Sequence, residues 1–419
     1  MRKMKDSGIA WIGEIPEEWT VAPLKHLVNI TMGQSPDSAD VSDDGEIPFM
    51  QGNADFGTQY PSPHLYCDNA KKMCDAGDIL LSVRAPVGAL NLADRTYGIG
   101  RGLCAIQARD LHRDFLYFAL MTLGGAFDYL SNGSTFDAIT TSDLKNIQIS
   151  VPPRDEQTKI SETLQEKFSE IGNAINEMRR LIDKLALYKQ SLITETVTKG
   201  LHPEAARKDS GVSWIGEIPR TSIVVPLTKK IAQIVDYRGK TPEKVNDGIF
   251  LVTAKNIKDG IIDYALSQEY IRPEDYDTVM SRGKPKIGDV LFTTEAPLGE
   301  VANVDREDIA LAQRVIKFTP TEEANPYYLK YWMMHQGFQQ FLQSLSTGST
   351  AAGIKASKLF MLKMVLHPLD EQRKIVSFLD AKCAAIDADI ARRRKLIERL
   401  SAYRRSLIYE VVTGKREVV

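Results

Sequence analysis

The stretch "DSGIAWIGEIP" at Asp6–Pro16 returns as "DSGVSWIGEIP" at Asp209–Pro219, with nine of its eleven letters unchanged. The two tryptophans, Trp11 and Trp214, lie 203 positions apart. A repeated phrase of this length indicates an internal duplication, and a duplication decides the architecture of a chain before any local pattern does.

Three further phrases recur in the same order along the chain. They are "AGDILLSVRAPVGAL" at 76–90 with "IGDVLFTTEAPLGEV" at 287–301, "NGSTFDAI" at 132–139 with "TGSTAAGI" at 347–354, and "PPRDEQTKI" at 152–160 with "HPLDEQRKI" at 367–375. The offset grows from 203 to 215 residues, so the second copy carries net insertions. Because these fall between the shared phrases, we expect them in surface loops.

The length of 419 residues predicts about two or three domains. The formal net charge of −2 favours no particular partner, so any nucleic-acid signal must be local. No secretory signal follows the opening residues, and no apolar run reaches the ~18 residues of a membrane span. Four cysteines in this length predict a reduced, cytoplasmic location.

Each copy ends in a segment with the periodicity of a long helix. Apolar residues recur at steps of three and four after each "DEQ", which is the seam of a coiled coil, and each seam would need the other as its cover. The predicted seam positions are Ile160, Leu164, Ile171, Ile175, Ile182, Leu185, Ile375, Leu379, Ile386, Ile390, Ile397 and Leu400.

The part of each copy before its helix mixes short β-rich runs with helical segments without a regular βαβ alternation, which favours an α+β fold. We therefore predict two pseudo-symmetric domains separated by two long antiparallel coiled-coil helices. The predicted parts are an N-terminal segment (1–20), a first domain (21–152), a central helix (153–198), a linker with the second repeated phrase (199–223), a second domain (224–367) and a distal helix (368–419).

With the doubled "DSG..WIGEIP", "GD.L", "GST" and "DEQ.KI" phrases in this order, the chain resembles the specificity subunit of type I restriction–modification enzymes over nearly its whole length. The resemblance implies two target-recognition domains that each read one half of a bipartite asymmetric DNA site. It implies helices that set the spacer and dock two adenine methyltransferase subunits, which restriction subunits join. S-adenosylmethionine, ATP and Mg²⁺ would then belong to the partner subunits, and this chain would hold no cofactor and carry no catalysis.

Several polar residues in aligned loops are candidates for contacts with DNA, because amides and cations suit base edges and phosphates. The substitution of Glu295 for Arg84 at one aligned position suggests that the two domains read different bases. Ordinary polar turns have the same composition, so both interpretations stay open. The candidates are Gln34, Ser35, Asn53, Arg84, Arg101, Ser134, Thr135, Lys240, Thr241, Lys255, Asn256, Arg314, Ser349 and Thr350.

No catalytic motif is evident. The chain lacks a GxxxxGK[ST] phosphate loop, and "NPYY" at 325–328 is explained by Asn325 as a helix N-cap with proline behind it. His64, Cys67 and Cys74 have the wrong spacing for zinc, so no metal site is predicted. The alternatives are a self-contained DNA-modifying or DNA-cutting enzyme and a coiled-coil scaffold that does not bind DNA.

The repeated phrase itself is predicted to be structural. We interpret Trp11 and Trp214 as apolar anchors that hold each domain against a helix end, with glycine and proline setting the turn.

Overall fold

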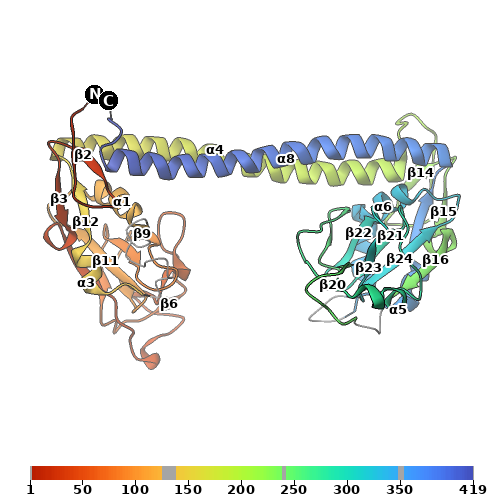
Figure 1. The fold of residues 1–419 in the computed structure, drawn as a ribbon, viewed down its shortest axis with the longest axis horizontal. Coiled ribbons are helices and arrows are strands. Elements are labelled where there is room, and N and C mark those ends of the chain that lie inside the picture. Colours follow the sequence, from red (N-terminus) through yellow and green to blue (C-terminus); the bar gives the residue numbers. More distant parts are fainter. Residues whose placement is uncertain (1, 125–137, 238–241, 348–352, 419) are drawn as a thin grey trace. The chain divides into compact units, whose positions relative to one another are not determined.

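The computed structural model describes residues 2–124, 138–237, 242–347 and 353–418. The chain forms two compact units, Met1–Met178 with Arg394–Val419, and Arg179–Arg393. Each unit contains one copy of the repeated domain and one part of each long helix (Figure 1). The mixed α and β architecture with two related domains is the predicted one.

The first domain is built on two small sheets. One is antiparallel in the order β4 (Val28–Met32), β11 (Leu103–Ala108), β8 (Ile79–Ser82) and β9 (Leu90–Leu92). The other has the order β6 (Leu65–Tyr66), β5 (Pro48–Met50), β10 (Tyr97–Ile99) and β7 (Met73–Cys74), with β5 and β10 parallel. Short helical elements complete it: η1 (Leu24–His26), η2 (Ser38–Asp40), η3 (Asn53–Asp55), α1 (Arg113–Met121) and α3 (Thr141–Asn146).

The second domain repeats this plan. Its antiparallel sheet has the order β16 (Ile231–Asp236), β24 (Val315–Pro320), β21 (Val290–Thr294) and β22 (Leu298–Asn303). Its second sheet has the order β20 (Tyr270–Ile271), β17 (Ile249–Val252) and β23 (Ile309–Leu311), with β17 and β23 parallel. The remaining elements are a hairpin of β18 (Ile257–Lys258) and β19 (Ile261–Ile262), η4 (Leu227–Lys230), η5 (Pro273–Asp275), α5 (Tyr276–Val279), α6 (Pro326–Met334), α7 (Gln336–Leu345) and η6 (Ala356–Met361).

The "GD.L" phrases form β8 and β21, as their β-rich composition predicts. The composition of 327–342 fits a single helix, but the structure divides this segment into α6 and α7 at His335. The backbone of His335 is extended, with φ −69° and ψ 149°, and its ring nitrogen Nδ1 accepts a hydrogen bond from the Phe338 N–H. His335 therefore ends one helix and caps the next. Asn325 caps α6 with Pro326 behind it, as predicted.

Each repeated phrase forms a two-stranded ribbon, β1 (Met4–Asp6) with β2 (Glu14–Pro16) and β13 (Arg207–Asp209) with β14 (Glu217–Pro219). A second ribbon brings the start of each domain to its end. It pairs β3 (Thr20–Pro23) with β12 (Gln148–Val151) in the first copy, and β15 (Ile223–Pro226) with β25 (Lys363–Leu366) in the second. Each domain therefore closes next to the residue where its long helix begins.

The long helices are α4 (Arg154–Lys199) and α8 (Leu369–Val412). In the first unit, Ile160 and Leu164 near the start of α4 share a core cluster with Leu407 and Val411 near the end of α8. In the second unit, the end of α4 and the start of α8 share another cluster, and Lys189 pairs with Asp387 at 2.6 Å. The two helices are thus antiparallel within each unit, as predicted.

The glutamine of each "DEQ" phrase ties its helix to the adjoining domain. Gln157 accepts a hydrogen bond from the His112 N–H at 2.8 Å and donates to the Pro152 carbonyl at 2.9 Å. Gln372 accepts from the Asn325 N–H at 2.8 Å and donates to the Glu323 and His367 carbonyls. Both amides are buried, so a loss of either would leave buried backbone groups without partners. This explains the repeated glutamine by structure rather than by DNA contact.

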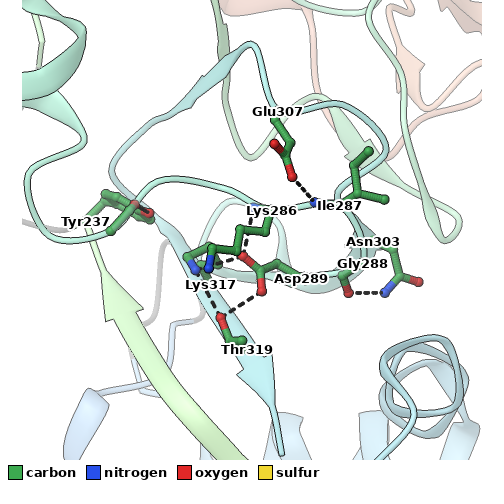
Figure 2. Close-up of polar contacts among 10 residues, drawn as sticks. Tyr237, Lys286, Ile287, Gly288, Asp289, Asn303, Glu307, Lys317 and Thr319 are labelled. Carbon is green, nitrogen blue, oxygen red and sulfur yellow. Dashed lines mark hydrogen bonds and ion pairs between the residues drawn. The ribbon is translucent and has the colours of Figure 1, made fainter.

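The second domain contains a buried ion pair that has no counterpart in the described part of the first domain (Figure 2). Lys317 Nζ lies 2.8 Å from Asp289 Oδ2 and donates to Thr319 Oγ1 at 3.0 Å, and the Thr319 hydroxyl donates to Asp289 Oδ1 at 2.7 Å. The Lys286 N–H also donates to this carboxylate, at 3.0 Å. The strand register places Ala105 in the first domain where Lys317 lies in the second, because each faces the corresponding leucine of β8 or β21.

Candidate nucleic-acid interface

The ends of four strands meet at one edge of the first domain. Main-chain hydrogen bonds join the segments that follow these strands: Gln34 N–H to Ile99 O, Gly100 N–H to Met50 O, Gly102 N–H to Gln51 O and Val83 N–H to Gly102 O, at 2.7–3.1 Å. We call residues 33–35, 51–53, 83–84 and 100–102 the strand-end edge of domain 1. A Cβ on Gly33 would lie 2.1 Å from the Gly100 carbonyl oxygen, so only glycine permits this approach.

This edge brings together five of the seven candidates predicted in the first domain. Gln34, Arg84 and Arg101 are exposed, while Ser35 and Asn53 are half-buried. The Ser35 hydroxyl accepts a hydrogen bond from Gln51 Nε2 at 2.8 Å, so Gln51, which the sequence did not single out, belongs to the same surface.

The second domain has the corresponding edge. The Ala312 N–H donates to the Val252 carbonyl, and the Thr294 N–H to the Arg314 carbonyl, both at 2.9 Å. The Ile354 N–H donates to the Thr294 carbonyl as the Ile139 N–H does to the Val83 carbonyl. We call residues 253–256, 294–296 and 312–314 the strand-end edge of domain 2. These main-chain hydrogen bonds are therefore the same in the two copies, although the side chains differ and only domain 2 has positive φ angles here, at Ala296 and Arg314.

A surface cavity of about 260 Å³ opens at the strand-end edge of domain 2. Lys244, Lys255 and Arg314 contribute three cations to its wall. Lys244 pairs with Glu269 at 2.6 Å, and Arg314 Nε lies 2.9 Å from Glu295 Oε1. The other lining residues are Pro242, Leu251, Thr253, Ala254, Ala296, Ala312 and Gln313. With the residues that the structure describes, Lys255 forms no ion pair, so its charge is available to an anion.

The aligned residues of opposite charge, Arg84 and Glu295, lie at corresponding places on the two edges. Arg84 is exposed and its backbone bridges to Ala138, and Glu295 bridges likewise to Gly353. Glu295 lies in an ion pair with Arg314, whose place in domain 1 is taken by Gly102. The two edges thus present different side chains on segments that share their main-chain hydrogen bonds. Lys244 and Glu269 were missed by the sequence analysis because nothing in their local pattern separates them from other surface charges.

Asn256 is a correction to the predicted DNA contacts. Its side chain is fully buried, at 0% exposure. Its amide donates to the Asp263 and Ser267 carbonyls at 3.0 Å, and its oxygen accepts from the Thr253 N–H and hydroxyl. All its hydrogen-bonding capacity therefore closes a loop, and none remains for a base edge. Its aligned counterpart Asn53 is half-buried and begins η3.

Ser134, Thr135, Lys240, Thr241, Ser349 and Thr350 lie outside the described residues.

The predicted seam residues divide into two groups by burial. Eight are buried, namely Ile160, Leu164, Ile171, Ile175, Ile375, Leu379, Ile386 and Ile390. Ile182, Leu185, Ile397 and Leu400 are half-buried and belong to neither helix-containing core cluster.

Both predicted anchors are half-buried and pack on a core cluster of their own unit that includes helix-end residues. Trp214 stacks on His335 and Phe341, with ring centroids 5.7 and 5.1 Å apart. In the first unit the Tyr409 hydroxyl of α8 donates to the Trp11 carbonyl at 3.1 Å. Trp19, which the sequence analysis overlooked, is fully buried and donates to Glu156 of the first "DEQ" phrase at 2.9 Å.

Burial changes the acidity of groups near these surfaces. Desolvation raises the pKa of Asp55 in η3, and His64 partly opposes this. Burial also raises the pKa of the Tyr237 phenol, and the negative charge of Asp289 adds to the effect. No cluster of three or more potential metal ligands occurs among the described residues. None of the described helices is long and apolar enough to cross a membrane.

The duplicated domains thus present two corresponding edges that carry different side chains. The family model described as "Type I restriction modification DNA specificity domain" matches the chain twice, at residues 16–181 and 229–399. The chain belongs to this family.

Individual relatives agree with this assignment. A putative type I restriction enzyme specificity subunit, MjaX of Methanocaldococcus jannaschii, is 44% identical over 158 residues, which is 36% of this chain and 37% of that relative. The MjaVIII specificity subunit of the same organism is 23% identical over 96% of this chain and 94% of its own length. The specificity subunit EcoBI of Escherichia coli is 21% identical over 76% of this chain and 69% of its own.

Solved structures share the fold. A chain from work on complex assembly and conformational transition of the type I R-M system has a TM-score of 0.71 at 16% identity, covering 96% of this chain and 99% of its own. The HsdS subunit from Thermoanaerobacter tengcongensis has a TM-score of 0.50 at 17% identity, covering 96% and 98%.

Proposed function

We propose that this chain is the non-catalytic DNA-recognition subunit of a type I restriction–modification system. Each domain reads one half of a bipartite asymmetric site. The paired helices α4 and α8 set the spacer between the halves and dock two adenine methyltransferase subunits, which restriction subunits join in the cytoplasm. Those partner subunits, and not this chain, bind S-adenosylmethionine, ATP and Mg²⁺.

One observation carries this proposal, namely that the two edges share their main-chain hydrogen bonds but carry different side chains. A duplicated domain that bound one partner twice would keep its contact residues alike. In this chain Arg84 of the first copy aligns with Glu295 of the second, and Gly102 corresponds to Arg314. Sequence in DNA is read by such side chains at base edges, while phosphate contacts only position the protein.

The division of labour follows from geometry. A reader made of two domains specifies two short half-sites and ignores the base pairs between them. The methyltransferase must extrude its target adenine from the stack, and that chemistry needs a pocket and a methyl donor on another subunit.

The experiment is co-expression of this chain with its methyltransferase in a host without adenine methylation, followed by methylome sequencing. A bipartite methylated motif should appear with both chains and vanish when either is absent. Methyl transfer or cleavage by the purified chain alone would instead establish a self-contained enzyme. A complex without sequence-selective binding, or no complex at all, would favour a scaffold.

A further inference from the structure

Arg314 has a backbone conformation that side chains disfavour. Its φ is +78°, and among the described residues only Asp259 and Ala296 share a positive φ without being glycine. In the left-handed region the Cβ crowds the following carbonyl, so such residues persist where a side chain serves a purpose. Arg314 and Ala296 both line the cavity at the strand-end edge of domain 2.

The first domain shows that this position does not need an arginine to fold. Gly102 accepts the Val83 N–H as Arg314 accepts the Thr294 N–H, so the two residues correspond. A Cβ on Gly102 would lie 2.6 Å from the Gln51 carbonyl oxygen, so domain 1 excludes any side chain there. The backbone at this position therefore differs between the domains, because Gly102 does not have the positive φ of Arg314. Only domain 2 has room there for a side chain, and it holds that side chain in a strained conformation.

Among the described residues, no hydrogen bond engages the terminal nitrogens of Arg314, so they are available to another partner. Glu295 contacts Nε at 2.9 Å, and the two side chains are 48% and 41% exposed. An ion pair this exposed contributes little to stability, so stability does not explain why the strain is tolerated. A carboxylate beside Nε limits the orientations that the planar guanidinium can take and leaves the two terminal nitrogens to a second partner.

We propose that Arg314 reads a guanine in the half-site recognised by domain 2 and that Glu295 is its positioning residue. The inference rests on the proposed function and deepens it. Guanine is the base that presents two adjacent acceptors, O6 and N7, in the major groove, and the arginine fork presents two donors. A phosphate is the weaker match, because Glu295 already neutralises the guanidinium. Lys255, on the same wall and without an ion pair among the described residues, suits a phosphate better.

The test uses the full chain in complex with its methyltransferase and a DNA library randomised in the second half-site. The wild-type complex should require guanine at one position. Arg314→Gly should weaken the preference there by about tenfold to hundredfold and leave every position of the first half-site unchanged. Because glycine accepts a positive φ, the thermal midpoint should not fall. Arg314→Asn, which also tolerates this conformation, is the second variant.

The matched control is Arg306→Gly. Arg306 is an arginine of the same domain with the same 48% exposure, paired with Asp308, and it does not line the cavity. It should leave the base preference unchanged. Glu295→Gln should reduce the preference at the same position by a smaller factor, because the arginine remains but loses its orientation.

Two outcomes would overturn the inference. One is uniform weakening over all sequences with a shallower salt dependence, which is the signature of a phosphate contact. The other is an unchanged preference in both Arg314 variants. If the wild-type complex shows no preference in either half-site, the proposed function fails before Arg314 is tested.

Discussion

Replacing Lys317 with methionine should destabilise the second domain by about 3 kcal/mol. The side chains of Lys317 and Asp289 are 1% and 3% exposed, and the substitution removes the only cation that contacts this carboxylate among the described residues (Figure 2). Breaking a buried pair costs roughly 3–5 kcal/mol, because the remaining charge loses its partner away from water. Asp289 keeps hydrogen bonds from the Lys286 N–H and the Thr319 hydroxyl, which places the expected cost at the lower end.

Amide hydrogen exchange, read peptide by peptide, measures this loss in the second domain separately from the first. Peptides of β21 and β24 should exchange on the order of 100-fold faster in Lys317→Met. The control is Lys230→Met, the same substitution at a pair with Glu323 whose carboxylate is 68% exposed. Its effect should stay below about 1 kcal/mol.

A double variant separates charge burial from packing. Adding Asp289→Asn to Lys317→Met removes the unpaired charge. The double variant should therefore be more stable than Lys317→Met alone by at least about 1 kcal/mol. If Lys317→Met costs no more than Lys230→Met, or if the double variant is the least stable of the three, the reasoning about the buried charge is wrong.

Three other predictions concern pH, the anchors and the spacer. Burial lowers the pKa of His335 to about 3. Below pH 6.5 the unfolded chain therefore protonates this histidine while the folded chain keeps it neutral. The free energy of unfolding of the second unit should consequently fall by about 3 kcal/mol between pH 7 and 4.5. His335→Asn should flatten this part of the pH–stability profile. Trp214→Ala should lower the free energy of unfolding of the second unit by about 2 kcal/mol and make that unit sensitive to limited proteolysis. Trp11→Ala should do the same to the first unit. Identical cleavage patterns from the two variants would contradict the anchor role. Four residues inserted after Tyr188 and four after Asp387 add one turn, about 6 Å, to both helices, and methylome sequencing should find a spacer about two base pairs longer.

The sequence predicted the large features of the fold because they rest on long, regular patterns. Periodicity indicated both helices, and the repeated phrases indicated two domains of one plan. Local capping chemistry was equally readable, since Asn325 with Pro326 behind it marks the start of α6. The break at His335 was not readable, because its surroundings remain apolar and helical in composition on both sides.

The candidate interface was only partly predictable. Lys255 and Arg314 were chosen by residue type and alignment, and the structure brings them to one cavity. Asn256 was chosen by the same reasoning and is buried, because its amide closes a loop with carbonyls seven and eleven residues away. Residue type does not distinguish an amide that faces solvent from one that satisfies the backbone.

The sequence by itself determined that this chain has two related domains, two long helices and a shared phrase at the start of each copy, since periodicity and repetition are properties of the chain alone. Only the tertiary structure decided which polar side chains are buried and paired and which are exposed. Lys317 looks like any strand lysine, yet it is buried against Asp289, while Arg314 occupies a strained turn beside Glu295. Burial and pairing depend on strands far apart in sequence, and those contacts exist only once the sheets have formed.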